Sequence, residues 1–321
     1  MLRSVYRMCR SVVHRISNRL DCPVVILLYH RVTSFDSDSH SLKVSPDNFR
    51  DQMRFLCENY PVLRFEADWK NVREPSIVVS FDDGYADNVL EALPILEEVG
   101  VPATFFIATG TIGSKTEFWF DELEFLVLRQ RSFPPYFELK DVRYGRRWST
   151  KTWTDRNVLF CEITPLIKEL DFDRRENWMM QLRDWVSSNR ITRESNRPMT
   201  VEELCALAES PVATIGAHGV THSALAALSP VQQMEELSSS KKKLASWTGK
   251  NISLFAYPYG ARRYYSRASI GLCNKVGFTK ATTNIPGQVH RWTDPYQIPR
   301  QKVSNWPMAR FAIELSKFWT N

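Results

Sequence analysis

The 321-residue sequence lacks paired cysteines. Its six cysteines are scattered singly and none forms a Cys-x-x-Cys pair, which argues against a thiolate zinc site and against a dithiol redox site. The chain also lacks an apolar run of about 18 residues and a signal-like apolar segment, so neither a membrane span nor a secretory signal is predicted. Single cysteines without a secretion signal fit a reducing compartment, and we expect a cytoplasmic protein.

Acidic residues are missing from residues 1–20, which contain five arginines. Apolar residues recur there at helical spacing, which predicts a basic amphipathic helix suited to the inner face of an anionic membrane. A first helix packed on the domain and a transit peptide are the alternatives. Elsewhere the basic residues are spread out and no nucleic-acid-binding module is recognisable, so nucleic acid is not an expected partner. Residues 21–321 are expected to form one domain.

Short apolar runs rich in β-branched residues alternate with amphipathic helical stretches in the rest of the chain. Continuous apolar runs bounded by turn residues are typical of strands buried on both faces. Their alternation with helices predicts a parallel sheet, open or closed into a barrel. The predicted strands are 24–29, 77–81, 103–108, 212–217 and 253–257, with weaker ones at 278–282 and 297–303, and the clearest helices are 46–58, 87–99 and 230–247.

About 100 residues separate the third and fourth predicted strands, far more than a simple crossover needs. The stretch at about 111–200 holds five of the ten tryptophans. It is interpreted as a mostly helical insertion. It either covers the face that carries the active site or forms a small core of its own without a role in chemistry.

Polar residues directly follow four of the predicted strands. His30 follows the first, Asp82 and Asp83 the second, His218 the fourth, and a Pro-Tyr-Gly turn at 258–260 the fifth. In a parallel α/β barrel the catalytic groups gather at the carboxyl ends of the strands. Two adjacent carboxylates at a buried strand end are costly unless a cation or a proton neutralises one of them. The alternative is a simple turn with a helix cap, since Asp-Gly is a common turn pair.

His218 and His222 are spaced i, i+4, so on a helix both imidazoles would face one side and could bind one metal ion together with Asp83. Two imidazoles and one carboxylate leave open positions, as in catalytic zinc sites, although Co²⁺, Ni²⁺ or Fe²⁺ would also fit. His30, with an unperturbed pKa near 6.5, is a candidate proton donor. The alternative interpretation is that His30 is a core histidine hydrogen-bonded to the backbone. His40 is expected at the surface.

Three motifs in this order resemble the polysaccharide deacetylase family, also called the NodB-homology or carbohydrate esterase 4 family. They are SFDDG at 80–84, HGVTH at 218–222 and FAYPYG at 255–260. The resemblance covers roughly 24–110 and 205–303. It implies a distorted (β/α)₇ barrel, here with the large, mostly helical insertion between the third and fourth strands. It also implies hydrolysis of an N-acyl group.

Carried over residue by residue, the resemblance makes Asp82 the general base and Asp83, His218 and His222 the metal ligands. The backbone N–H of Tyr259 would then help to hold the oxyanion.

Two features of many family members are missing. Ala256 stands where an arginine usually orients the base, and the late Leu-x-His motif has no good counterpart. The LYHRV segment at 28–32 is similar to a subgroup of exopolysaccharide N-deacetylases with permuted motif order, so the acid role is assigned to His30. Arg300 is the candidate to replace the missing arginine. The residues expected to contact substrate are Arg31, Pro258, Tyr259 and Arg300.

The expected activity is therefore metal-dependent removal of an N-acetyl group from an amino sugar in a polysaccharide, a glycolipid or a lipid-linked glycan precursor. The basic first 20 residues favour a lipid-linked substrate used in biosynthesis at the membrane surface. The alternatives are a deformylase of a lipid-linked amino sugar and a carbohydrate-binding pseudoenzyme.

Overall fold

The computed structural model describes residues 17–18, 20–34, 38–189 and 193–319. The amphipathic helix predicted for residues 1–20 lies almost entirely outside these ranges and stays a prediction. Within them, no helix combines the length and the apolar character that a membrane crossing requires.

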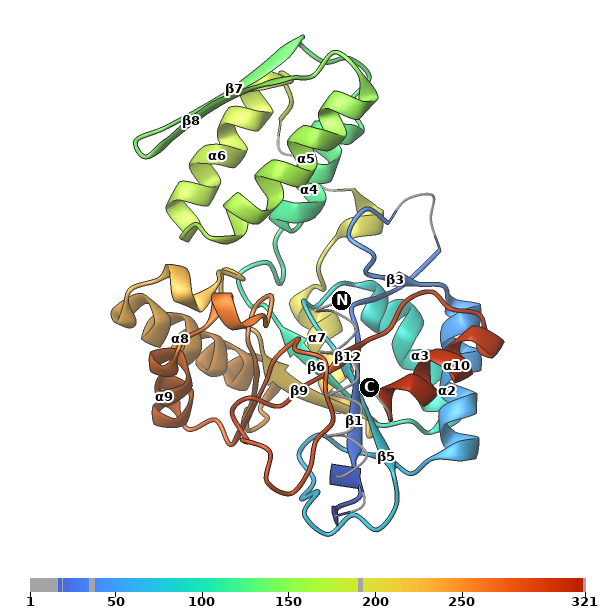
Figure 1. Cartoon of the computed structure of the whole chain (residues 1–321). Helices are drawn as coiled ribbons and strands as arrows, with labels where there is room; N and C mark the ends of the chain where they lie inside the picture. The colour runs from blue at the N-terminus through green and yellow to red at the C-terminus, as the bar shows by residue number, and fades with distance from the viewer. Residues whose placement is uncertain (1–16, 19, 35–37, 190–192, 320–321) are drawn as a thin grey trace, which may run out of the picture.

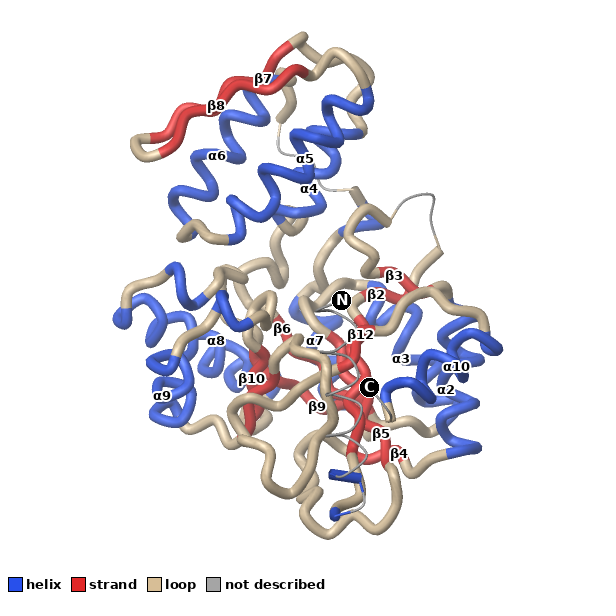
Figure 2. The backbone as a smooth tube through the Cα atoms, in the orientation of Figure 1, coloured by secondary structure: helices blue, strands red, loops and turns tan. Residues whose placement is uncertain are grey.

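A curled parallel sheet forms the centre of the fold (Figures 1 and 2). Its strand order is β11-β10-β9-β6-β5-β1-β12, and β4 pairs with the first half of β5. The strands are β1 (Val24–Tyr29), β4 (Val62–Leu63), β5 (Ser76–Phe81), β6 (Ala103–Ile107), β9 (Ala213–Ala217), β10 (Leu254–Ala256), β11 (Lys280–Thr282) and β12 (Gln301–Lys302). All seven predicted strands are confirmed, and the last two are shorter than expected.

The two edges of this sheet are linked by backbone hydrogen bonds. The segment that enters β12 runs beside the end of β11, with Thr283 N–H donating to Ile298 O (2.8 Å) and Arg300 N–H donating to Ile285 O (3.1 Å). The sheet is therefore a distorted barrel of seven principal strands, open where these two short strands replace a regular ladder. This confirms the predicted fold class.

Alternation along each strand decides which side chains enter the barrel. In β1, Val24 and Ile26 belong to the inner apolar cluster, whereas Val25 and Leu27 pack outward against the helices. The same alternation, carried past the end of β1, turns His30 toward the inside. Every second residue of these strands therefore points into the barrel, and those at the strand ends, such as His30, lie at its mouth.

Helices cover the outside of the sheet (Figure 1). The predicted helix at 87–99 begins as a π-helix because Pro94 has no N–H to donate, which interrupts the regular ladder. The helices of the barrel are α2 (Pro46–Asn59), the π-helix η1 (Asn88–Ala92), α3 (Leu93–Val99), α7 (Val201–Glu209), α8 (Pro230–Thr248), α9 (Arg267–Val276) and α10 (Met308–Phe318), with short 3₁₀ turns η3 (Leu225–Ala227) and η4 (Arg262–Tyr264) and a small ladder of β2 (Arg31–Val32) with β3 (Lys43–Val44).

Between β6 and β9 the chain builds a second lobe, green to yellow in Figure 1. It has its own apolar core, which includes Phe118, Leu159 and Trp178. The lobe consists of α4 (Trp119–Leu128), β7 (Tyr136–Asp141), β8 (Tyr144–Ser149), α5 (Trp153–Lys168), α6 (Phe172–Trp185) and the 3₁₀ turn η2 (Glu194–Asn196). The mostly helical insertion is confirmed, but the β7–β8 hairpin was not predicted because its apolar alternation extends over only a few residues.

Candidate active site

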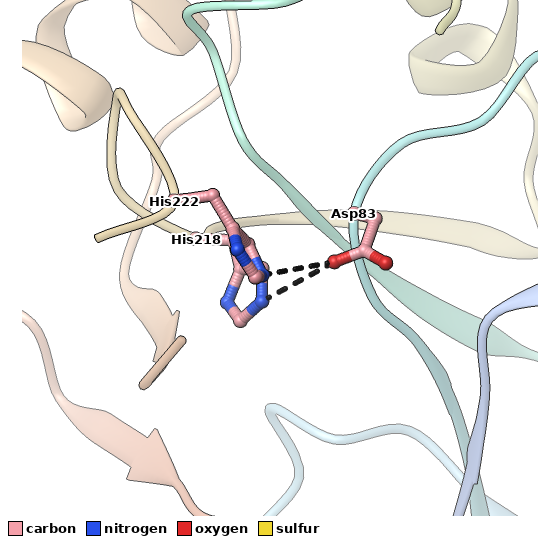
Figure 3. Close-up of side chains that lie close together, drawn as sticks. All are labelled: Asp83, His218 and His222. Carbon is pink, nitrogen blue, oxygen red and sulfur yellow. Dashed lines mark ion pairs between the residues drawn. The ribbon is translucent and has the colours of Figure 1, made fainter. Parts of the chain in front are cut away.

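Three predicted metal ligands meet at the mouth of the barrel (Figure 3). The ligand atoms of Asp83, His218 and His222 all lie within 4.8 Å of one another, and all three side chains are buried. One carboxylate oxygen of Asp83 lies 3.2 Å from His222 Nε2 and 3.6 Å from His218 Nε2. These distances leave room for an ion bound by all three groups.

The two histidines do not lie on a helix, so a helix is not what brings their imidazoles to one side. β9 ends at Ala217, and the chain then makes a tight loop in which Gly219 (φ 78°) and His222 (φ 54°) adopt left-handed backbone angles. Glu236 of α8 holds this loop, because its carboxylate accepts from the backbone N–H of Val220 (2.7 Å). A Cβ on Gly219 would lie 2.8 Å from that carboxylate, so the loop requires glycine there.

The insertion also supports the histidine loop, through Arg175 of α6. This buried guanidinium donates to the backbone carbonyls of Thr221 (2.6 Å) and His222 (3.4 Å). Nothing in the spacing of the motifs pointed to Arg175, because it lies about 45 residues before the loop that it supports. The insertion therefore has its own core and a contact with the site.

The donor set fits a divalent metal. His218 Nδ1 lies 2.7 Å from the carbonyl oxygen of Ala256, which can only accept, so Nδ1 carries the proton and Nε2 keeps its lone pair. Burial lowers the pKa of His218, and it lowers that of His222 to about 3, which keeps both imidazoles neutral as metal ligands must be. Burial raises the pKa of Asp83, and no described lysine or arginine pairs with its carboxylate. A divalent cation would supply the missing charge.

Asp82 lies beside this cluster and is held by Arg300. The two side chains form two parallel bonds, of 2.7 Å from Nη1 to Oδ1 and 2.6 Å from Nη2 to Oδ2. Burial by itself would raise the pKa of Asp82, but Arg300, together with His218 and His30, more than offsets this, and the pKa falls to about 2. Asp82 is thus an anion throughout the neutral range.

Arg300 occupies the role expected for the arginine that is missing at Ala256. The small side chain of Ala256 faces the barrel interior, and Arg300 reaches Asp82 from the opposite edge of the sheet. Its other donors go to Thr283 O (3.0 Å) and Asn284 Oδ1 (2.5 Å). Arg300 therefore positions Asp82, and because it also lines the cavity, its contact with substrate stays a prediction.

These groups line a cavity of about 320 Å³, a size typical of small-ligand sites. His40 also lines it, with Nε2 3.0 Å from the carbonyl oxygen of Phe120, so its expected place at the surface is wrong. His40 lies in the loop before β3. It does not directly follow a predicted strand, so the sequence pattern gave no reason to place it at the cavity. Lysine and arginine side chains that were not predicted line the cavity as well, namely Lys168, Arg263 and Lys302.

His30 lies at the same cavity, half-buried after the end of β1. Burial lowers its pKa to about 4, so the ordinary value near 6.5 that was assumed from the sequence is corrected. Its backbone carbonyl accepts from Asn88 Nδ2 (2.8 Å), which ties the end of β1 to η1. His30 is therefore a neutral imidazole in the resting protein.

Tyr259 lines the cavity with a left-handed backbone (φ 61°). Its hydroxyl accepts from Trp119 Nε1 (3.0 Å) and donates to the carbonyl of His222 (3.1 Å), and its backbone N–H donates to no other described residue. Asp83, His222 and Tyr259 are three of the five described non-glycine residues with positive φ, so backbone strain concentrates at this site. Pro258 is buried behind Tyr259 and does not line the cavity, which corrects its assignment as a substrate contact.

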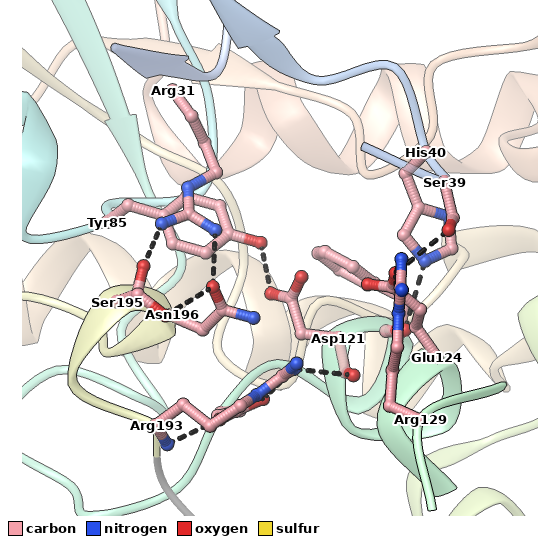
Figure 4. A network of polar contacts seen from close by, with 12 residues as sticks. Arg31, Ser39, His40, Tyr85, Asp121, Glu124, Arg129, Arg193, Ser195 and Asn196 are labelled. Atoms are coloured by element: carbon pink, nitrogen blue, oxygen red, sulfur yellow. Dashed lines mark hydrogen bonds and ion pairs between the residues drawn. The ribbon is translucent and has the colours of Figure 1, made fainter. Parts of the chain in front are cut away.

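Arg31 is also not a substrate contact. Only 1% of it is exposed, and it lies outside the cavity lining. Its guanidinium pairs with Asp87 (2.8 Å). It also donates to Asn196 Oδ1 (3.0 Å) and lies 4.2 Å above the ring of Tyr85 (Figure 4). Arg31, on β2, therefore joins the segment that follows β1 to the end of the insertion.

Comparisons with known proteins identify the family of this chain. The family model described as polysaccharide deacetylase matches residues 70–133 and 179–281, just over half of the chain. YxkH of Bacillus subtilis (strain 168), named by inference as a polysaccharide deacetylase, is 22% identical over 286 residues, covering 87% of this chain and 71% of YxkH.

Solved structures share the fold. BC0361, a polysaccharide deacetylase from Bacillus cereus, superposes with a TM-score of 0.58 at 20% identity, over 92% of this chain and 70% of that one. The Streptococcus pyogenes deacetylase PplD, solved in complex with acetate, gives a TM-score of 0.58 at 16% identity, over 92% of this chain and 98% of PplD. Fold, motifs and family match converge: this chain belongs to the polysaccharide deacetylase family and is a hydrolase of amide bonds in carbohydrates.

Proposed function

We propose that the protein is a metal-dependent N-deacetylase that releases acetate from an N-acetylated amino sugar. One observation carries this proposal: a buried carboxylate held by arginine, Asp82, lies next to a three-ligand cluster in a single cavity. A bound divalent cation, with Zn²⁺ preferred for this donor set, would polarise the acyl carbonyl and lower the pKa of a water molecule.

Asp82 then accepts a proton from the attacking water. Its low pKa makes it a weak base, but Arg300 fixes both carboxylate oxygens, so the base stays ionised and oriented. Water adds to the acyl carbon, and the negative charge that develops on the acyl oxygen is held by the backbone N–H of Tyr259. The C–N bond then breaks, giving acetate and a free amine.

His30 supplies a proton to the leaving amine, which would otherwise depart poorly. Because burial lowers its pKa to about 4, His30 is neutral before the reaction. Negative charge that develops on the substrate beside it raises its proton affinity. His30 then receives the proton that Asp82 removed from the attacking water and passes it to the leaving nitrogen, so the step needs no further proton.

The substrate is proposed to be an amino sugar of a polysaccharide, glycolipid or lipid-linked glycan precursor. Deformylation of a lipid-linked amino sugar is the enzymatic alternative. The pseudoenzyme alternative relied on two absences, the orienting arginine and the late Leu-x-His motif. The pairing of Arg300 with Asp82 removes the first of these reasons.

The test uses the purified full chain loaded with Zn²⁺. Acetate and formate release are measured on sugar nucleotides, lipid-linked sugars and N-acetylated oligosaccharides, before and after chelation. We expect acetate release that stops with chelator and returns with metal. Release of formate alone would favour the deformylase, and bound metal without any release would contradict the proposal.

Residues 1–20 are proposed to bind the inner face of an anionic membrane, which also implies a cytoplasmic location. The support is their sequence alone. Co-sedimentation with vesicles containing phosphatidylglycerol should fall on deletion of residues 1–20. Equal sedimentation of both forms would count against the proposal, and cell fractionation tests the location.

A further inference from the structure

Three cationic side chains line the cavity without a carboxylate partner. Lys168 comes from the last turn of α5, Arg263 from η4 and Lys302 from β12. Among the described residues, none of the three forms an ion pair with an acid. Lys168 Nζ lies 5.2 Å above the ring of Tyr259, Arg263 donates to Tyr264 Oη (2.6 Å), and Lys302 Nζ donates to His40 O (3.3 Å).

Asp38 attracts Lys302 electrostatically but does not neutralise it. Its two carboxylate oxygens accept from the backbone N–H groups of Leu42 (2.7 Å) and Lys43 (3.1 Å). The charge on Lys302 is therefore still available to a ligand.

The charges that line the cavity are unbalanced. Its acids are Asp82 and Asp83, whereas its cations are Arg300 and the three side chains above. Arg300 already neutralises Asp82, and a divalent ion at Asp83 would more than neutralise that carboxylate. The cavity mouth thus carries excess positive charge, and walls of low dielectric strengthen its attraction for an anion.

The pKa of Lys168 supports the view that the three cations lie close enough to repel one another. Burial lowers its pKa, and repulsion from Arg263 and Lys302 lowers it further, so the three charges act on one another. A lysine at a helix C-terminus is favourable for the helix dipole alone, but this explains only Lys168. Arg263 and Lys302 come from two other elements and converge on the same cavity.

Lys168 belongs to the part of the insertion that lies between the two segments matched by the family model. The neighbouring side chains Ile163 and Ile167 are buried in the core of the insertion, which fixes the end of α5 over the site. This cation is therefore delivered by a segment that the family model does not match.

We propose that Lys168, Arg263 and Lys302 form a subsite for a negatively charged group of the substrate, a phosphoryl or a carboxylate attached next to the N-acetylated sugar. This rests on the proposed function and narrows its substrate class. A phosphoryl group would come from a nucleotide- or lipid-linked sugar, and a carboxylate from a neighbouring acidic sugar.

The test compares three substrates on the Zn²⁺-loaded full chain. They are N-acetylglucosamine 1-phosphate, its neutral methyl glycoside, and a glucuronosyl-N-acetylglucosamine disaccharide. We expect kcat/KM for acetate release to be at least about tenfold higher for one of the anionic substrates, which also identifies the source of the charge. In Lys168→Met and Lys302→Met that preference should fall about tenfold.

Arg262→Met is the matched control, since Arg262 neighbours Arg263 but contacts Gln297 instead of lining the cavity. It should keep the native preference. Equal hydrolysis of all three substrates, with no change in Lys168→Met, would overturn the subsite and leave the proposed deacetylase intact.

A binding measurement separates the two proposals. Calorimetric titration with N-acetylglucosamine 1-phosphate and with the glucuronosyl disaccharide measures their Kd values. The Kd of the preferred anion should rise at least about tenfold in the double variant Lys168→Met/Lys302→Met. It should also rise with added salt. Such binding without turnover would support the subsite and contradict the deacetylase. Absence of binding by both anionic sugars would overturn the subsite.

Discussion

Arg300 and Asp82 are 218 residues apart in the chain, yet their side chains form a doubly bonded ion pair with both partners buried. The pair spans from the segment before β12 to the end of β5, so it also joins two strands on either side of β1. This ion pair keeps Asp82 ionised beside the predicted metal site. It also connects β5 to the segment before β12 at the mouth of the barrel.

Breaking this pair should cost stability. Arg300→Met leaves a buried carboxylate without its cation and should lower the free energy of unfolding by about 3–5 kcal/mol, measured by urea denaturation. Asp82→Asn/Arg300→Met should lose less than the sum of the single changes. Arg310→Met is the control, because Arg310 is exposed, and it should change the free energy by less than about 0.5 kcal/mol. Additive single effects would mean that the pair is not coupled.

Asp82→Asn should lower kcat for acetate release by at least about 100-fold, because the amide cannot accept the proton of the attacking water. Metal content, measured by elemental analysis, should stay near one ion per chain, since Asp82 is not among the three proposed ligands. Near-native turnover in this variant would move the base elsewhere.

His30→Ala should separate amide from ester hydrolysis. Amide cleavage requires protonation of the leaving nitrogen and should slow by about 100-fold, whereas 4-nitrophenyl acetate has a leaving group that departs without a proton. Rates on an N-acetylated sugar and on this ester are compared in the same preparation. If both rates fall equally, His30 has another role.

Glu236→Gln should weaken metal binding by about 10–100-fold, because an amide in place of one carboxylate oxygen opposes the N–H groups of Val220 and Thr221 that hold the histidine loop. Competition with a chelator measures the affinity. Glu235→Gln, on the exposed side of the same helix, is the control and should bind metal as the native protein does. Unchanged affinity in Glu236→Gln would show that the loop is held by other contacts.

Asp121 predicts a pH dependence of stability. It lies on α4, where Tyr85 Oη donates to its carboxylate (2.6 Å; Figure 4), and burial raises its pKa to about 7. The unfolded value is about 3.9. Because the folded pKa is the higher one, the protonated form favours folding, and this contribution is complete below about pH 4 and lost as the pH rises through 7.

Asp121→Asn keeps an acceptor for Tyr85 and removes this titration. Its free energy of unfolding relative to the native protein should therefore rise by about 2 kcal/mol between pH 5.5 and pH 8. The exposed variant Asp51→Asn should keep a constant difference over the same range. A constant difference for Asp121→Asn as well would falsify the assignment of a neutral carboxyl.

The sequence by itself determined the strands and the positions at their ends. Buried parallel strands appear as continuous apolar runs, so β1, β5 and β6 were found nearly to the residue. A polar residue that directly follows such a run must lie at the sheet edge where the strands end, which predicted the grouping of Asp82, Asp83 and His218. These inferences depend only on local pattern, and for that reason they needed no tertiary contacts.

Only the tertiary structure decided what surrounds those groups. The pairing of Arg300 with Asp82, the support of the histidine loop by Arg175, and the arrival of Lys168 at the cavity each join segments that are distant in the chain. The same holds for pKa values, since the shift of His30 follows from burial by residues of several elements. Contacts and desolvation depend on how the elements pack, and a local residue pattern carries no information about that packing.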